Sequence, residues 1–440
     1  MIYIPASICI YPKFHIVAFR NFIYRRKNLF CEEVPVEEIC KKIGTPFYLY
    51  SSNQILANFN FLSKKFKGYN ILIAYAVKAN SNQAILRLLA QRGAGADVVS
   101  YGEMLRALKA GIPANKIVFS GVGKTELEIS QAIEQRILQF NIESYQEFLT
   151  IEEIAREKNI KANIAIRINP DVAAGGHPKI STGKKTDKFG VSPEEAIKIY
   201  IAAKQCFYLN IVGVDMHIGS QILKIKPFES SFKKIEKFCK KLEKYEIKIK
   251  NIDLGGGLGV NYSSKKIKEI TNEYTKLVRE ISVRTKKKII IEPGRFLVAN
   301  AGILVTKVLY KKYNDDKKFI IVDSGMNDFL RPALYDAKHV VRQLKLESKK
   351  KYEDYFDIVG PICETADVIM ENALLSKNID RGDYLFVEKA GAYGSTMSST
   401  YNSRSLISEV LVSKKNFFEV RKKMKEDDFL KLEKVPSWIK

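Results

Sequence analysis

One lysine is the residue whose position most directly suggests covalent chemistry. Lys78 follows the apolar run Ile71–Val77, inside the string Tyr75–Asn80. Burial beside apolar residues lowers the pKa of a lysine, and a neutral amine attacks a carbonyl carbon to form a Schiff base. Most lysines that follow strands are solvated loop residues. Lys78 therefore predicts a reactive amine only in combination with other groups.

Two glycine-containing turns have the chemistry of a phosphate site. Gly255, Gly256 and Gly257 begin a Gly-Gly-Gly-Leu-Gly run, and Gly294 with Arg295 follows the next apolar segment. Glycine lets backbone N–H groups approach an anion closely, and arginine adds charge-assisted donors. A tight turn is the alternative use of one glycine run, but the two segments together favour phosphate binding.

A carboxylate and an imidazole complete a recognisable set of groups. Glu292 follows an isoleucine run and could hold a proton on a pyridine nitrogen, or could be a paired structural carboxylate. His217, close to Ser220, could stack on a flat ring, although a lone histidine is more often part of a core. A lysine, a phosphate site, a carboxylate and a stacking residue together predict pyridoxal phosphate, with its aldehyde on Lys78.

These residues need a scaffold that brings distant segments together. Eight short apolar runs alternate with amphipathic, helix-like segments, which is typical of a (β/α)8 barrel. The runs are Ile71–Val77, Ala96–Val99, Ile117–Phe119, Ile137–Ile142, Ile164–Ile168, Ile211–Met216, Asn251–Leu254 and Lys288–Ile291. A doubly wound open sheet is the alternative, but such sheets usually have fewer strands.

The candidate residues fall where such a barrel would use them. Active sites of (β/α)8 barrels form at the carboxyl ends of the strands, and a phosphate site often follows strands seven and eight. The polar residues at these predicted ends are Lys78, Asp97, Arg167, His217, Ser220, the glycines 255–257 and Glu292 with Arg295. We therefore expect one site at one end of the barrel.

After Arg295 the pattern changes to strands without regular helices, which predicts a mainly antiparallel β domain. The fold class is therefore α/β, a barrel with an added β-barrel or sandwich domain. We expect the barrel at residues 47–300 and a discontinuous β domain at residues 20–46 and 301–440. Residues 1–19 are expected to be a disordered extension.

A second group of polar residues lies in the expected β domain. Arg331, near Tyr335, suits bidentate carboxylate binding, and Glu364 could hold an ammonium group. Cys363 could donate a proton, although a free cysteine is more often a small buried hydrophobe. The chain has four histidines and shows no metal-ligand spacing, so we expect no metal site.

Composition excludes several other classes of protein. The chain has 440 residues, 46% hydrophobic and 28% charged, with a net charge of +24. The basic residues spread over helix-like segments such as Phe232–Lys250, so we expect no nucleic-acid partner. No apolar run approaches the ~20 residues that span a bilayer. Six well-separated cysteines without a CxxC pair favour a reducing compartment, and we expect the cytoplasm.

In the motifs that it carries and in their order along the chain, the protein resembles the diaminopimelate decarboxylases of the alanine-racemase-like (fold type III) class of pyridoxal-phosphate enzymes. The resemblance runs from about Phe30 to Val412. Its motifs are Gly44–Tyr50, Tyr75–Asn80, Gly95–Ser100, His177–Gly183, Lys188–Gly190, His217–Gln221, Glu292–Arg295, Met326–Ala337, Gly360–Glu364 and Gly391–Arg404.

The resemblance implies a role for each candidate residue. Lys78 would carry the cofactor as a Schiff base, His217 would stack on its ring and Glu292 would pair with its nitrogen. The phosphate would be held by Ser220, the glycines 255–257, Gly294, Arg295 and Tyr393, with Asp97 and Arg167 supporting the cofactor. One end of the substrate would be held by Arg295, Arg331, Tyr335 and Tyr393. Cys363 and Glu364 would reach in from the second subunit of a homodimer.

The implied reaction is decarboxylation of meso-diaminopimelate at its D centre to L-lysine and CO2, the last step of lysine biosynthesis, by a carboxy-lyase (EC 4.1.1.20). Related decarboxylases of ornithine, arginine or carboxynorspermidine are the nearest alternatives, and a racemase is disfavoured because its tyrosine motif is not evident. A non-catalytic pyridoxal-phosphate protein and a phosphate-binding barrel without pyridoxal phosphate are the remaining alternatives.

Overall fold

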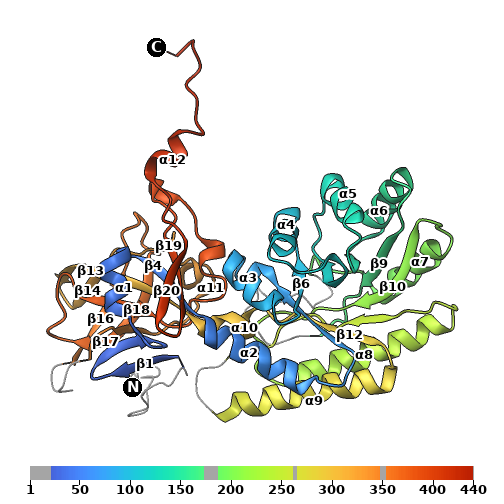
Figure 1. Ribbon diagram of the computed structural model, residues 1–440, viewed down its shortest axis with the longest axis horizontal. Coiled ribbons are helices and arrows are strands. Elements are labelled where there is room, and N and C mark those ends of the chain that lie inside the picture. Colours follow the sequence, from blue (N-terminus) through green and yellow to red (C-terminus); the bar gives the residue numbers. More distant parts are fainter. Residues whose placement is uncertain (1–20, 173–186, 261–264, 347–352, 440) are drawn as a thin grey trace, which may run out of the picture.

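The computed structural model describes residues 21–172, 187–260, 265–346 and 353–439, which form two lobes (Figure 1). The expected extension at residues 1–19 and the motif at 177–183 lie outside these residues. Within the described ranges, none of the helices combines the length and the apolar composition needed to cross a bilayer.

A closed barrel of eight parallel strands forms one lobe and confirms the predicted (β/α)8 architecture. Each strand coincides with one of the apolar runs. The strands are β5 (Ile71–Ala76), β6 (Gly95–Val98), β7 (Ile117–Phe119), β8 (Gln139–Ile142), β9 (Ala162–Arg167), β10 (Leu209–Asp215), β11 (Asn251–Asp253) and β12 (Lys288–Ile291).

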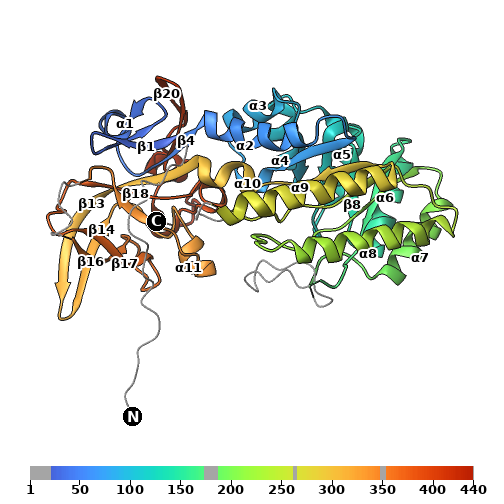
Figure 2. The same ribbon diagram turned by 90° about the horizontal axis from the view of Figure 1, so that it is seen from below.

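Helices cover the outside of this barrel (Figure 2). They are α2 (Ser52–Lys65), α3 (Gln83–Ala90), α4 (Tyr101–Lys109), α5 (Glu126–Glu134), α6 (Tyr145–Glu157), α7 (Pro193–Lys204), α8 (Lys226–Glu243) and α9 (Lys265–Thr285). Hydroxyl side chains fix several of their starts: Ser100, Thr125, Ser144 and Ser192 each accept a backbone N–H in the first turn.

The period of two along each strand separates the outer core from the barrel interior. Leu72, Ala74, Val118 and Ile290 form a small apolar cluster of their own, whereas the alternate residues Ile73 and Ile291 belong to the large core shared with the helices. Residues in the interior positions nearer the carboxyl ends are polar. This alternation turns side chains from several strands toward one site.

The second lobe, called here the sheet lobe, contains a nine-stranded sheet. Its strands are β4 (Phe47–Ser51), β13 (Gly302–Asn314), β14 (Lys317–Val322), β15 (Val341–Gln343), β16 (Glu353–Val359), β17 (Val368–Ser376), β18 (Tyr384–Val387), β19 (Ser408–Ser413) and β20 (Asn416–Arg421). Most pairs are antiparallel, as predicted, while β4–β19 and β14–β16 are parallel.

A small three-stranded sheet of β1 (Phe22–Arg25), β2 (Asn28–Cys31) and β3 (Val34–Pro35) precedes α1 (Val36–Ile43). Its core joins the nine-stranded sheet through residues such as Phe47 and Val305. β4 pairs with β13 and β19 and not with any barrel strand. The expected barrel segment starts at residue 47 and so includes β4, which belongs to the sheet lobe. The domain boundaries themselves remain a prediction.

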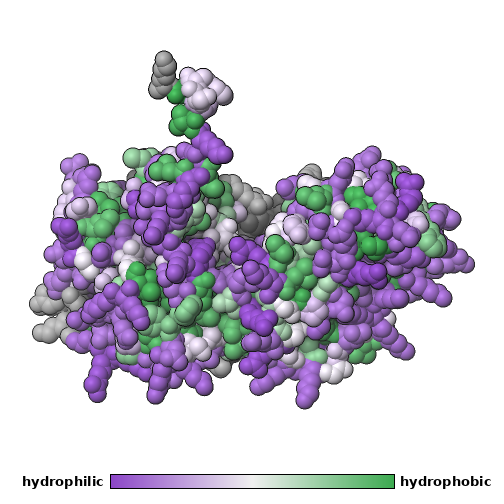
Figure 3. Space-filling model, turned by 45° about the horizontal axis from the view of Figure 1, so that its top comes forward, coloured by the Kyte–Doolittle hydropathy of each residue, from purple (hydrophilic) through white to green (hydrophobic). Residues whose placement is uncertain are grey.

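Two short helices carry candidate site residues. They are α10 (Arg295–Val298), which follows β12, and α11 (Arg331–Tyr335), which lies between β14 and β15 in the sheet lobe. At the C-terminus, α12 (Glu426–Leu430) and the chain after it extend away from the sheet lobe (Figure 1). Figure 3 shows hydrophobic residues among those of this C-terminal segment. Leu432, Val435 and Trp438 of the segment are exposed.

Candidate active site

Lys78 lies in a single 3-10 turn, Val77–Ala79, directly after β5. Its Nζ is 2.8 Å from Oδ2 of Asp97, a fully buried carboxylate near the end of β6. Burial alone lowers the pKa of Lys78, but the negative charges of Asp97 and Glu292 outweigh it and raise the pKa above its usual value. The expectation of a lowered pKa was therefore wrong: Asp97 holds this amine as an ammonium ion.

His217 follows β10 and presents a neutral ring. Its Nδ1 accepts a hydrogen bond from the backbone N–H of Gly256 at 3.0 Å, so this nitrogen carries no proton. Burial, and then the positive charges of Arg167 and Lys78, lower the pKa of His217 well below its usual value. The 3.9 Å contact between Nδ1 and Glu292 is consequently not an ion pair. A neutral, oriented imidazole is suited to stacking on a flat ring.

Glu292 follows β12 and is almost fully buried. Its Oε1 has no hydrogen-bond partner, and its pKa is raised well above the usual value by burial and then by Asp253, Asp97 and Asp215. A buried carboxyl with an unused oxygen is costly unless another group completes it. Glu292 therefore has the chemistry expected for pairing with a pyridine nitrogen.

The glycine run after β11 needs the conformational freedom of glycine. Gly255 and Gly257 have φ of 64° and 96°, and a Cβ on Gly257 would lie 2.6 Å from the carbonyl oxygen of Gly219. A Cβ on Gly256 would collide with the carbonyl oxygen of Glu292. The backbone of this loop thus packs directly against the turns that follow β10 and β12.

Arg295 begins α10 and contacts Ser220 and Tyr393, two other residues expected at the phosphate. One Nη donates to Ser220 Oγ at 3.2 Å, and the guanidinium lies 4.8 Å from the ring centroid of Tyr393. Its Nε is buried without a hydrogen-bond partner. The preceding Gly294 fits closely, because a Cβ there would lie 3.0 Å from that of Ala79. A cation with an unused donor beside a hydroxyl fits an anion such as phosphate.

A loop of the sheet lobe, residues 391–396, lies against the end of β5. The backbone N–H of Tyr393 donates to the Ala79 carbonyl at 2.7 Å, and Thr396 Oγ1 donates to the Lys78 carbonyl at 3.1 Å. The Asn80 amide donates to the carbonyl of Gly391 at 3.1 Å. These bonds bring Tyr393 to the barrel end, although more than 300 residues separate it from Lys78 in sequence.

Arg167 is the last residue of β9 and lies near acidic residues that the sequence analysis did not predict, Glu143 and Asp215. It is 2.7 Å from Glu143 and 3.8 Å from Asp215, and these carboxylates raise its pKa against the lowering effect of burial. Asp215, Asp253 and Glu292 offer carboxylate oxygens that all lie within 4.8 Å of one another. Asp215 and Asp253 are the last residues of their strands, and that position was the available signal in the sequence.

Arg331 and Tyr335 lie on α11, with the guanidinium 5.8 Å from the tyrosine ring centroid. Arg331 Nε donates to Nε2 of the buried His339 at 3.3 Å. Burial lowers the pKa of His339 to about 3, so the ring accepts this bond in its neutral form. His339 is a second residue that the sequence did not indicate.

Cys363 and Glu364 lie on the surface, between β16 and β17. The Cys363 amide donates to Asn402 at 3.1 Å, and Tyr401 donates its hydroxyl hydrogen to Glu364. Both side chains are exposed. Their described contacts are with the 401–402 turn and not with Lys78 or its neighbours, so one chain does not bring the two predicted groups together.

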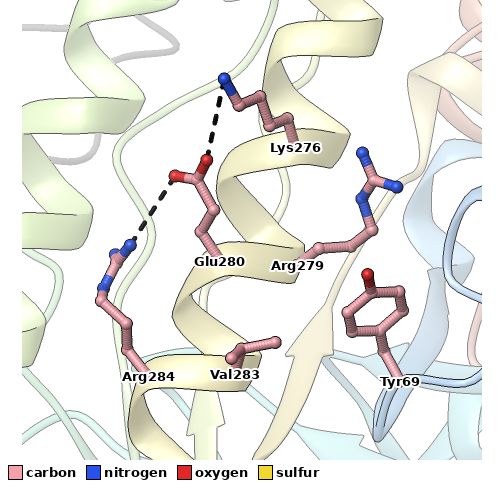
Figure 4. A pocket seen from close by; sticks show the side chains of 6 residues that line it. All are labelled: Tyr69, Lys276, Arg279, Glu280, Val283 and Arg284. Atoms are coloured by element: carbon pink, nitrogen blue, oxygen red, sulfur yellow. Dashed lines mark ion pairs between the residues drawn. The ribbon is translucent and has the colours of Figure 1, made fainter.

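A depression elsewhere on the surface is lined by Tyr69 and by α9 residues (Figure 4). Glu280 lies 3.9 Å from Lys276 and 3.7 Å from Arg284. Arg279 lies over the Tyr69 ring at 5.8 Å. Tyr69 precedes β5 and Lys78 follows it, so this depression lies at the opposite end of the barrel from Lys78.

The chain is similar in sequence and in structure to known proteins. Residues 52–299 match the family described as pyridoxal-dependent decarboxylase, pyridoxal binding domain. Diaminopimelate decarboxylase of Aquifex aeolicus is 45% identical over 404 residues, which are 92% of this chain and 95% of the relative. The crystal structure of diaminopimelate decarboxylase from Helicobacter pylori complexed with L-lysine is similar, with a TM-score of 0.85 and 44% identity, and the match covers 90% of this chain and 98% of that one.

Proposed function

The chain belongs to the diaminopimelate decarboxylase family of pyridoxal-dependent enzymes, and from this premise we propose how its residues carry out the reaction. The protein is a carboxy-lyase that decarboxylates meso-diaminopimelate to L-lysine and CO2. We propose that the lost carboxylate is the one at the D centre. A cytoplasmic location remains a prediction.

Pyridoxal phosphate is the cofactor that the barrel end fits. The support comes from two buried atoms without hydrogen-bond partners, Glu292 Oε1 and Arg295 Nε, at the barrel end that also carries the amine of Lys78. Lys78 would bond the aldehyde carbon, His217 would contact the ring face and Glu292 would hold a proton at the ring nitrogen. Arg295, Ser220 and the glycine loop would hold the phosphate.

When bound, pyridoxal phosphate accepts the electron pair that the departing carboxylate leaves behind. The chain supplies the surroundings of that reaction. Asp97 keeps the Lys78 amine at the end of β5, ready to hold and then release the aldehyde. Arg167 keeps the carboxyl groups of Glu143 and Asp215 in place beside β9.

The distal end of the substrate carries both an ammonium and a carboxylate. We propose that Arg331, Tyr335, Arg295 and Tyr393 bind the carboxylate, and that Glu364 binds the ammonium. Cys363 would return a proton to the substrate carbon after CO2 leaves. Because Cys363 and Glu364 are exposed and their described contacts are with their own turn, we propose that each completes the site of the second subunit in a homodimer.

The observation that carries the substrate assignment is the near full-length match at 45% identity to a diaminopimelate decarboxylase. We would measure CO2 release and product identity with pyridoxal phosphate, offering meso-diaminopimelate, ornithine, arginine and L-lysine separately. Lysine formed only from meso-diaminopimelate is the expected result.

Two other outcomes would have distinct meanings. Turnover of ornithine or arginine alone would retain the cofactor and overturn the substrate. No turnover of any substrate, with an absorption band of bound cofactor, would favour a non-catalytic pyridoxal-phosphate protein.

A further inference from the structure

A chain of buried amides leads through the barrel to Asp253. Asn251 donates to Gln139 at 3.0 Å, and Gln139 donates to Asn141 Oδ1 at 2.8 Å. The Asn141 amide nitrogen is thereby directed at Asp253 Oδ2, 3.5 Å away, and at Ser120. All these side chains are buried. This orientation means that Asn141 offers Asp253 a donor and not an acceptor.

Asp253 and Glu292 differ in the donors that they receive. Asp253 accepts the backbone N–H of Gly255 at 3.0 Å in addition to the Asn141 amide. The two carboxyl groups also offer oxygens that lie within 4.8 Å of each other, while Glu292 Oε1 has no hydrogen-bond partner. Two buried carboxylates this close cannot both be charged without strong repulsion, so one proton lies between them.

We propose that Asp253 is a positioning residue that accepts a hydrogen bond from a protonated Glu292 and thereby keeps on Glu292 the proton that the cofactor nitrogen would take up on binding. The O–H bond of Glu292 would then break, an N–H bond would form on the ring, and Glu292 would be left as a carboxylate beside a cationic ring. Donors favour the charged form of the group that receives them, so the charge stays on Asp253 and the proton on Glu292. The bond also fixes the Glu292 carboxyl with Oε1 free. This inference rests on the proposed function of the site.

Other charged and titratable groups surround the pair and must be considered with it. They are Asp97, Asp215, Lys78, Arg167, His217 and Tyr274. The pKa of Asp253 is raised to about 7 by burial, against the lowering effect of the Gly255 N–H. Burial and then the charge of Asp253 raise the pKa of Glu292 well above its usual value.

The test compares Asp253→Asn with the wild type in the binding of pyridoxal phosphate. In the variant, the amide of the new side chain would donate to Glu292 and keep it ionised before the cofactor binds. Calorimetry in buffers of different ionisation enthalpy should then show that the wild type takes up one proton fewer than the variant on binding. The ratio of the two dissociation constants should change about tenfold per pH unit.

A structural role alone would give a different result. If Asp253→Asn changes the affinity by a factor that is independent of pH, with equal proton uptake, the shared proton is wrong. In a Glu292→Gln background the Asp253→Asn substitution should have no further effect, because the residue acts through Glu292. A difference that persists in this background would equally overturn the proposal.

Asp328→Asn is a matched control in the sheet lobe. Asp328 is also buried, also accepts a glycine N–H at 3.0 Å, and has a pKa that burial raises to about 7. Its replacement should leave the proton uptake on cofactor binding unchanged. An equal change in both variants would assign the effect to buried aspartates in general and contradict the proposal.

The cofactor-free protein supplies a readout that does not depend on the proposed function. Infrared spectra at neutral pH should contain a protonated carboxyl band that both Glu292→Gln and Asp253→Asn remove. Protonated-carboxyl absorption of the same intensity in the wild type and in both variants would overturn the inference. If the wild type fails to bind pyridoxal phosphate but shows this band, the proposed function fails while the shared proton stands.

Discussion

At the scale of residues, the candidate site combines charged groups that have partners with buried polar atoms that lack them. Asp97 compensates Lys78, and Glu143 with Asp215 compensates Arg167. Glu292 Oε1 and Arg295 Nε stay without partners in a buried environment. Unused buried polar atoms are rare in folded proteins. We propose that these two, among the several such atoms of the described residues, mark where the ring nitrogen and the phosphate of a cofactor would bind.

Replacing Lys78 with alanine should abolish turnover, because the alanine variant has no amine to bond the cofactor aldehyde. CO2 release is the measurement. Lys318→Ala is a suitable control, since Lys318 is exposed to a similar extent, 39% against 36%, and also pairs with an aspartate. Substantial CO2 release by the Lys78 variant would contradict the Schiff-base role.

Replacing Cys363 with alanine should slow turnover by about 10²–10⁴-fold, the usual contribution of a positioned proton donor. The absorption spectrum of the bound cofactor should stay unchanged, because the Cys363 side chain is exposed and its described contact is made by its backbone. Cys206→Ala, a half-buried cysteine on the barrel, should retain full activity. An unchanged rate in the Cys363 variant would remove the proton-donor role.

At the scale of elements, the strand ends determine the chemistry. β10, β11 and β12 place Asp215, Asp253 and Glu292 side by side, and the loops that follow them pack against one another. Side chains along each strand alternate between the barrel interior and the outer core. This alternation places Leu72 and Val118 inside the barrel and turns the three acids inward nearer the carboxyl ends of the strands. The site is thus a property of strand register as much as of residue type.

Gly257→Ala should destabilise the loop after β11. The residue has a φ of 96°, and the added Cβ would meet the Gly219 carbonyl oxygen at 2.6 Å. We expect a loss of about 1–3 kcal/mol in the free energy of unfolding, together with weaker cofactor binding. Gly123→Ala, where no atom lies within 4 Å of the added Cβ, should be neutral in thermal denaturation. Equal melting temperatures for both variants would contradict this account.

The acid cluster should make the stability of the cofactor-free protein depend on pH. Burial raises the pKa of Asp253 to about 7, compared with about 3.9 in an unfolded chain. In the folded state Asp253 therefore takes up a proton as the pH falls below about 7, in addition to the proton that we place on Glu292, whereas in the unfolded chain it does so only at a lower pH. The contribution to stability is fully present below the unfolded pKa and is lost as the pH rises through the folded pKa. Glu292 and Asp215 shift in the same direction.

Calorimetric unfolding of the cofactor-free protein between about pH 5 and pH 8 tests this prediction. The melting temperature should fall with rising pH, and it should fall less in Asp253→Asn, which cannot ionise. Parallel curves for the two proteins would show that Asp253 is not protonated in the folded state.

At the scale of the whole molecule, residues of both lobes meet at the end of the barrel. The loop at residues 391–396 belongs to the sheet lobe, yet it bonds to Lys78, Ala79 and Asn80 at the barrel end. Cys363 and Glu364 lie elsewhere on the sheet lobe and are exposed. A second copy of the chain is therefore the source that we propose for the remaining groups.

Mixing two inactive variants tests this assembly. If Cys363 acts across the interface, a Lys78→Ala subunit paired with a Cys363→Ala subunit has one complete site. Equal mixing after dissociation and reassociation should restore about a quarter of the wild-type rate, because half of the dimers are hybrids with one of two sites intact. Each variant treated alone is the control. No recovery, with hybrids verified by tagged subunits, would place Cys363 in its own subunit's site.

Local sequence patterns established the barrel and indicated most residues of the proposed site. Apolar runs of strand length, separated by amphipathic helices, indicated all eight barrel strands, because local periodicity follows directly from the burial of one face. Lys78, His217, the glycine run and Glu292 stood out because each follows such a run. The resemblance to a family then supplied Tyr393 and connected Cys363 and Glu364 to the site of Lys78, which no local pattern could do.

The pKa shifts and the strand pairing depend on the tertiary structure. The raised pKa of Lys78 depends on Asp97, which lies on a neighbouring strand, and that of Glu292 depends on acids from β6, β10 and β11. The pairing of β4 with β13 and β19 placed it in the sheet lobe. Charge interactions and strand pairing act through space between segments that are distant in sequence, so a reading of consecutive residues cannot determine them.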